Sequence, residues 1–189
     1  MSDYHIFDLF FDHQVKFMYS GIEATMESKD SLYTCALALS TYTEVMGGLV
    51  TGNLREEYGH SQKNYEAFLS YLGEKYVKLN NELKEQKLTL HKIIRNKLVH
   101  EFALRESHII MNSEIPTDEK IGIEVRFFDN KIIHLNFLVK EYYRDFKNGV
   151  AKYRDDLKFS ERQPAFSDGQ ILFMNFIRAV VENHQSEES

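Results

Sequence analysis

The sequence predicts a mainly α-helical domain into which a small antiparallel β-sheet is inserted. Three observations predict this fold class. Only two prolines interrupt 189 residues, so long helices can form. Apolar residues recur at three- and four-residue spacing in several segments. Residues 107–137 differ, because short runs rich in isoleucine, valine and phenylalanine alternate there with turn residues.

The length and composition are those of one globular domain, which we take to cover residues 1–189. The chain is 43% hydrophobic and 28% charged, and its net charge of −6 excludes a surface that is polycationic throughout. A single cysteine, Cys35, excludes an intramolecular disulfide and favours a reducing compartment. The N-terminus lacks the basic and apolar segments of a secretory signal, and the apolar stretch 34–50 is short for a membrane span. We therefore expect a cytoplasmic protein with no membrane partner.

A helical core is expected over about residues 4–105. Apolar residues spaced by three, four and seven predict an amphipathic helix over 4–27. A second helix should begin near Leu32, behind capping residues, and end at Gly52-Asn53. The aromatic and leucine residues of segment 65–76 predict a shorter third helix.

The fourth helix of this core is the strongest prediction. Residues 82–105 contain neither glycine nor proline and are rich in leucine, isoleucine, lysine and glutamate, which predicts one continuous helix. Four apolar residues at a spacing of four form the stripe expected to face the core: Leu90, Ile94, Leu98 and Phe102.

A β insert is expected over about residues 107–137. Three short segments rich in β-branched and aromatic residues are candidate strands: 107–112, 121–128 and 131–137. Asp129-Asn130 separates the last two segments and is a hairpin signal. We therefore expect a sheet of two or three antiparallel strands.

Two helices should follow the insert, over about residues 138–184. Aromatic residues at helical spacing predict the first helix at about 138–158. The segment RQPAFSDG contains proline and glycine and should end it. The last helix is expected at about 168–183.

One short motif bears on function. Segment 90–102 reads LHKIIRNKLVHEF and contains Arg95, Asn96 and His100. On an α-helix, Asn96 and His100 share one face, whereas Arg95 lies about 140° from His100. Two copies of this helix packed about a two-fold axis would bring two arginines and two histidines into one cleft. The motif therefore favours a homodimer.

The motif lies in a locally basic segment. Residues 84–100 hold five basic side chains against Glu85 alone, a net charge of +4 within an acidic chain. Such a patch can attract phosphate groups, so Lys92 and Lys97 are candidate phosphate-binding residues. Lysine-rich helix faces are also common as plain solvated surface, and this alternative remains open.

The segment RNKLVHEF resembles the R-x4-6-H motif of the HEPN superfamily of helical domains. Arg95 and His100 match the two fixed positions, and Asn96 occupies the place of the polar residue that often follows the arginine. The resemblance in architecture covers about residues 4–105. The hairpin insert and the last two helices match no subfamily.

The resemblance implies a function. Many HEPN proteins are metal-independent endoribonucleases of toxin and phage-defence systems, and they act as homodimers with the motif at the interface. It implies that His100 is a general acid or base, that Arg95 holds the scissile phosphate, and that Asn96 orients one of them. Cleavage would leave 2′,3′-cyclic phosphate and 5′-hydroxyl ends without any cofactor or metal. RNA and a cognate antitoxin or regulatory protein would be its partners.

Other members of the superfamily are non-catalytic nucleotide- or protein-binding modules, which is the main alternative. A purely structural helical protein, in which the motif is accidental, is a third. Glu57-x-x-His60 has the spacing of di-iron ligands, but that site needs a second copy and two further glutamates. Gly47-Gly48 is interpreted as a site of close helix packing or a turn. Cys35 is interpreted as an inert core thiol.

Overall fold

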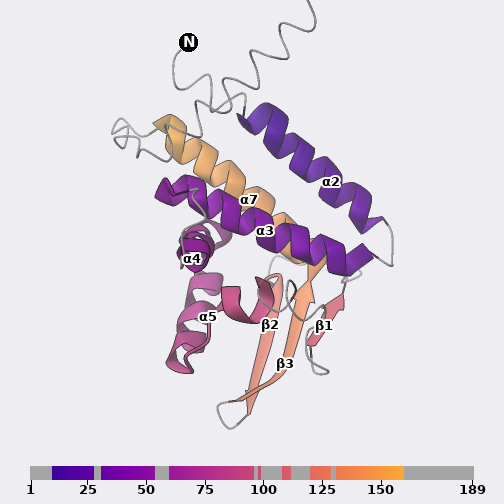
Figure 1. Cartoon of the computed structure of the whole chain (residues 1–189), viewed down its shortest axis with the longest axis vertical. Coiled ribbons are helices and arrows are strands. Elements are labelled where there is room, and N and C mark those ends of the chain that lie inside the picture. The colour runs from indigo at the N-terminus through magenta and orange to yellow at the C-terminus, as the bar shows by residue number, and fades with distance from the viewer. Residues whose placement is uncertain are drawn as a thin grey trace, which may run out of the picture.

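Most of the described chain is helical, and three strands form one small sheet beside the helices (Figure 1). The computed structural model describes residues 10–27, 31–53, 60–95, 98, 108–111, 120–128 and 131–159. None of the helices in these residues is both long and apolar enough to cross a lipid bilayer.

The predicted first helix is present from Phe10 onwards, but it begins irregularly. A π-helical turn, η1 (Phe10–Val15), continues directly into α2 (Lys16–Met26). Both Ile22 and Phe17 are apolar residues of the pattern that predicted this helix, and Ile22 is buried, whereas the side chain of Phe17 is 75% exposed. One apolar residue of the predicted amphipathic face therefore points to solvent. The predicted residues 4–9 lie outside the described part.

Helix α3 (Leu32–Thr51) contacts α2, α4 and α7. The predicted end is confirmed, because Gly52 has φ 69° and terminates the helix in the left-handed conformation that favours glycine. The interpretation of Gly47 as a close packing site is also confirmed. A Cβ atom on Gly47 would lie 1.6 Å from the carbonyl oxygen of Asn64 in α4.

The region after α3 corrects the predicted helix boundaries. Helix α4 (His60–Leu72) and helix α5 (Glu74–Glu85) meet at Gly73, whose φ of 131° favours glycine. Because α5 ends at Glu85, the prediction of one continuous helix over 82–105 is wrong.

Hydrogen bonds explain this break. Lys87 adopts φ 59°, and the N–H of Leu88 donates to the carbonyl of Leu83 at 3.0 Å, which is the closing bond of a Schellman motif. The buried side chain of Asn80 then accepts a hydrogen bond from the N–H of Leu90 at 2.8 Å. The chain thus turns over the end of α5 and starts a π-helical turn, η3 (His91–Arg95).

The sheet contains β1 (His108–Met111), β2 (Ile123–Phe128) and β3 (Lys131–Leu138), in the order β1-β3-β2. The predicted hairpin is confirmed, because β2 and β3 pair antiparallel. The prediction of a purely antiparallel sheet is wrong, because β1 pairs with β3 in parallel. The sheet is mixed, with the buried residues Leu135 and Phe137 on its central strand.

Helix α7 (Val139–Phe159) follows β3 without a loop and confirms the predicted helix at 138–158. Tyr142 and Phe146 are fully buried on it. The Tyr142 hydroxyl lies 2.9 Å from Thr43 Oγ1 and 3.0 Å from the Tyr65 hydroxyl, so a buried polar chain joins α3, α4 and α7. The predicted last helix at 168–183 lies outside the described residues.

Two further interpretations concern possible reactive groups. Cys35 is fully buried, and burial raises the pKa of its thiol to about 11, which agrees with an inert core thiol. Glu57 lies outside the described residues. Among those that are described, no group of three or more His, Cys, Asp or Glu side chains is arranged to hold a metal ion.

Candidate functional site

The structure describes two of the five predicted site residues. Lys92 is exposed and Arg95 is half-buried, and both belong to η3. Asn96, Lys97 and His100 lie outside the described residues. The geometry given below therefore concerns Arg95 and the side chains that surround it.

Packing of the segment 90–98 places Arg95 at the edge of the core. Leu90, Ile94 and Leu98 are fully buried, which confirms three positions of the predicted stripe, whereas Phe102 is outside the described part. The hydroxyl of Tyr33 donates to the carbonyl of Leu98 and ties this segment to the start of α3. A π-helical turn such as η3 is rare and recurs at functional sites of proteins.

Glu44 of α3 is the partner of Arg95. It is the one charged residue among the 20 residues of this helix. The Nε–H of Arg95 donates to Glu44 Oε2 at 2.9 Å, and the two side chains are 24% and 20% exposed. The ion pair is therefore partly shielded from water. This shielding makes its charge-assisted hydrogen bond stronger than one on an open surface.

His91 lies behind this ion pair. Its Nε2 atom is 2.9 Å from Ser61 Oγ of α4 and 3.9 Å from Glu44 Oε2. Its ring also packs edge-on against Tyr65, with the ring centroids 5.6 Å apart. Burial lowers the pKa of His91 below its usual range, although the charge of Glu44 opposes this shift. The imidazole is therefore neutral at pH 7.

The arrangement of Ser61, His91 and Glu44 is not that of a hydrolase triad. In such a triad the serine and the carboxylate contact different ring nitrogens. The carboxylate then orients the ring through one nitrogen while the other nitrogen accepts the serine proton. Here both Ser61 Oγ and Glu44 Oε2 approach Nε2. The cluster is suited to holding Arg95 rather than to activating Ser61.

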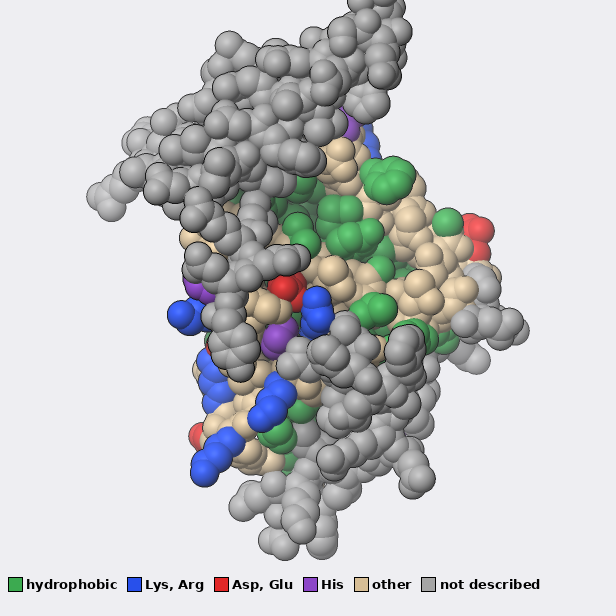
Figure 2. All heavy atoms as spheres, in the orientation of Figure 1, with side chains coloured by type: hydrophobic (Ala, Val, Ile, Leu, Met, Phe, Trp, Pro, Cys, Tyr) green, Lys and Arg blue, Asp and Glu red, His purple; other side chains and the backbone are tan. Residues whose placement is uncertain are grey.

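Ion pairs reduce the positive charge of the predicted basic segment. Lys84 contacts Glu66 Oε2 at 2.5 Å, and Arg95 is paired with Glu44, whereas Lys87 and Lys92 are exposed. Figure 2 shows the face of the molecule that is turned to the viewer in Figure 1. Several basic side chains lie on its lower part, and a histidine, an acidic and a basic side chain lie together near its centre. The folded segment thus attracts polyanions less than the sequence alone predicts.

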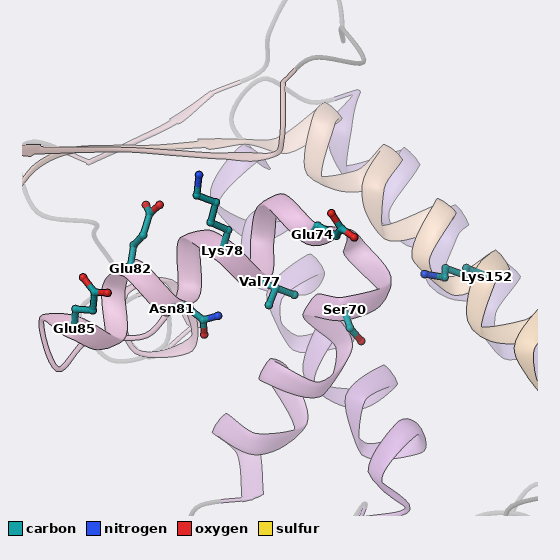
Figure 3. A pocket seen from close by; sticks show the side chains of 8 residues that line it. All are labelled: Ser70, Glu74, Val77, Lys78, Asn81, Glu82, Glu85 and Lys152. Carbon is teal, nitrogen blue, oxygen red and sulfur yellow. The ribbon is translucent and has the colours of Figure 1, made fainter.

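A groove of about 600 Å³ lies away from Arg95, between the end of α4, α5 and α7. Figure 3 shows most of its lining side chains spread along α5, with Ser70 at the end of α4 and Lys152 of α7 on the opposite side. Its charged residues carry both signs: Glu74, Lys78, Glu82, Glu85 and Lys152. No predicted site residue lines this groove, so we do not assign it to the functional site.

Sequence reasoning did not identify Glu44, His91 and Ser61. The signal available for Glu44 was its position as the lone charge on an apolar helix. His91 lies within the motif segment but outside the motif. No protein-family model, curated protein or solved structure matches this chain.

Proposed function

We propose that this chain is a HEPN-type, metal-independent endoribonuclease that acts as a cytoplasmic homodimer in a toxin or phage-defence system. The observation that supports the proposal is the half-buried Arg95, held in place by Glu44 at the start of the segment that resembles the HEPN motif. The mainly helical fold agrees with this class of protein.

The state of Arg95 suits phosphate binding. A guanidinium group has five N–H donors, and its terminal nitrogens can contact two oxygens of one phosphate at once. Among the described residues, Glu44 bonds to Arg95 only through Nε. The contact with Glu44 does not use the two terminal nitrogens, and these are the atoms that would bind a phosphodiester.

The proposed reaction needs the whole motif. The ribose 2′-oxygen attacks the phosphorus atom, the bond to the 5′-oxygen breaks, and the products carry 2′,3′-cyclic phosphate and 5′-hydroxyl ends. His100 transfers a proton at the attacking or leaving oxygen, and Asn96 orients His100 or the phosphate. Arg95 stabilises the charge that develops on the phosphate. Lys92 and Lys97 contact neighbouring phosphates.

A second candidate function is a non-catalytic module that binds a nucleotide or a protein, such as a cognate antitoxin or regulator, in the same cleft. The ion pairs of Arg95 and Lys84 favour this candidate, because they neutralise part of the charge that would attract RNA. A single nucleotide or an acidic protein segment needs fewer positive contacts than a long RNA does.

Cleavage of RNA in EDTA separates the two candidates. We expect the wild-type protein to cut total RNA or a tRNA pool and to leave 2′,3′-cyclic phosphate ends. His100→Ala should reduce cutting by at least about 100-fold, the usual contribution of a general acid or base. Absence of cutting by a folded wild-type dimer would favour the binding module. A monomer in light scattering would contradict both candidates, since both need the two-fold cleft.

A further inference from the structure

We propose that Glu44 is a positioning residue for Arg95: it holds the guanidinium from the Nε side and so keeps the terminal nitrogens directed at an oxyanion. This inference rests on the proposed function. It adds a residue of α3, 51 positions away in sequence, to a site that the motif alone places within residues 95–100.

The first support is the place of Glu44 in the fold. Helix α3 is otherwise uncharged, and its packing partners include η3, which carries Arg95. Glu44 is thus the one side chain of α3 that can form an ion pair with the guanidinium of Arg95. The side chains of Arg95 and Glu44 are 24% and 20% exposed. Because water screens their attraction less than it would on an open surface, one fixed geometry of the pair is favoured.

The second support is what lies on the other side of the carboxylate. His91 Nε2 is 3.9 Å from the same oxygen that accepts from Arg95, and Ser61 holds the ring through a 2.9 Å contact. His91 is buried and neutral at pH 7, so it does not compete with Arg95 for the charge of Glu44. The carboxylate therefore pairs with Arg95, and the buried ring of His91 lies beside it.

The third support is the chemistry of the contact. A hydrogen bond at Nε fixes the plane of the guanidinium and leaves the two terminal nitrogens for a bidentate contact. A catalytic arginine held in this way needs no reorganisation when charge develops on the phosphate. Loss of this positioning should therefore lower kcat, whereas loss of the negative charge of Glu44, which repels RNA in the ground state, should leave KM equal or lower it.

Kinetics of RNA cleavage in EDTA test this role. Glu44→Ala should lower kcat about tenfold and leave KM equal or lower, because one charge-assisted hydrogen bond is lost and a repulsive charge disappears. Glu44→Gln keeps an oxygen that accepts from Nε and should retain most of the rate. Asp12→Ala is the matched control, because Asp12 pairs with Arg154 at 3.1 Å on elements outside this site, η1 and α7. Wild-type kcat in Glu44→Ala, or an equal loss in Asp12→Ala, would overturn the inference.

A readout that does not depend on cleavage keeps the two proposals separable. In proton–nitrogen NMR of the wild-type protein we expect a slowly exchanging Nε–H signal that Arg95→Lys removes. Glu44→Ala should abolish the slow exchange, and Glu44→Gln should preserve it. Both variants should lower the pKa of His91, because the carboxylate charge opposes the effect of burial. If the wild type cuts no RNA, the proposed function fails, whereas an unchanged Arg95 signal in Glu44→Ala overturns the positioning role.

Discussion

At the scale of single residues, Gly47 sets how closely α3 approaches α4. A Cβ atom at this position would lie 1.6 Å from the carbonyl oxygen of Asn64, which is a backbone atom and cannot rotate away. Gly47→Ala should therefore lower the free energy of unfolding by roughly 1–3 kcal/mol, because the two helices must move apart. Urea denaturation followed by circular dichroism measures this loss.

Gly21→Ala is the matched control for this substitution. Gly21 also lies within a helix, α2, but a Cβ atom there meets no atom within 4 Å. The substitution should raise the free energy of unfolding by about 0.5–1 kcal/mol, since alanine is the better helix former. A similar gain in Gly47→Ala would show that helix propensity, and not the contact with α4, decides the outcome.

In the candidate site, Arg95 could be predicted from the sequence, whereas the residues that surround it could not. Arg95 could be selected from the sequence because its motif is local. Glu44 could not, because an ion pair across 51 residues depends on how α3 packs against η3. The same holds for Ser61 and His91, which belong to separate elements, α4 and η3. Local spacing identifies a functional segment, whereas tertiary packing selects its partners.

At the scale of elements, the existence of helices was easier to predict than their ends. The left-handed Gly52 made the end of α3 readable from the sequence. The end of α5 was not readable, because its turn residue is Lys87, a good helix former. Likewise, Asp129-Asn130 identified the hairpin of β2 and β3, but no local signal tells that β1 pairs with β3 in parallel.

The turn after α5 contains a lysine in the left-handed backbone conformation. Lys87 has φ 59°, a conformation that costs a residue with a Cβ atom roughly 1–2 kcal/mol. Lys87→Gly should therefore raise the free energy of unfolding by about 0.5–1 kcal/mol, after the entropic cost of glycine is deducted. Thermal unfolding should show a corresponding increase in Tm.

Lys78→Gly serves as the control for this prediction. Lys78 is exposed within α5, where glycine should cost about 1 kcal/mol relative to a good helix former. Opposite signs for the two substitutions are expected. A loss in Lys87→Gly as large as in Lys78→Gly would mean that the helix continues through this position, as the sequence pattern predicts.

At the scale of the whole molecule, one buried tyrosine connects the sheet to the helices. The Tyr76 hydroxyl of α5 accepts a hydrogen bond from the N–H of Gly122 at 2.7 Å and donates one to Asp145 Oδ2 of α7 at 2.7 Å. Arg144 donates to the other oxygen of Asp145 and to the carbonyl of Lys120. Burial and the carboxylate of Asp145 raise the pKa of Tyr76, so the hydroxyl keeps its proton over the physiological range.

Tyr76→Phe should therefore weaken the contact of α5 with the segment before β2 and with α7, because both hydrogen bonds of the hydroxyl are lost. The substitution leaves the ring in place but removes the partner of a backbone N–H and of a buried carboxylate oxygen, each at a cost of roughly 1–3 kcal/mol. We expect a total loss of about 2–6 kcal/mol in the free energy of unfolding. The m-value should stay unchanged, because sheet and helices share one core and unfold together.

Tyr153→Phe provides the comparison that isolates the hydrogen bonds. Tyr153 is buried on α7, and its hydroxyl has no hydrogen-bond partner within the part of the chain that the structure describes. Removing an unsatisfied hydroxyl should be neutral or slightly stabilising, so this variant should stay within about 0.5 kcal/mol of the wild type or exceed it. Equal losses in both variants would show that the cost comes from removing a buried hydroxyl and not from its hydrogen bonds to Gly122 and Asp145. A lower m-value in Tyr76→Phe would instead show that the sheet separates from the helices before they unfold.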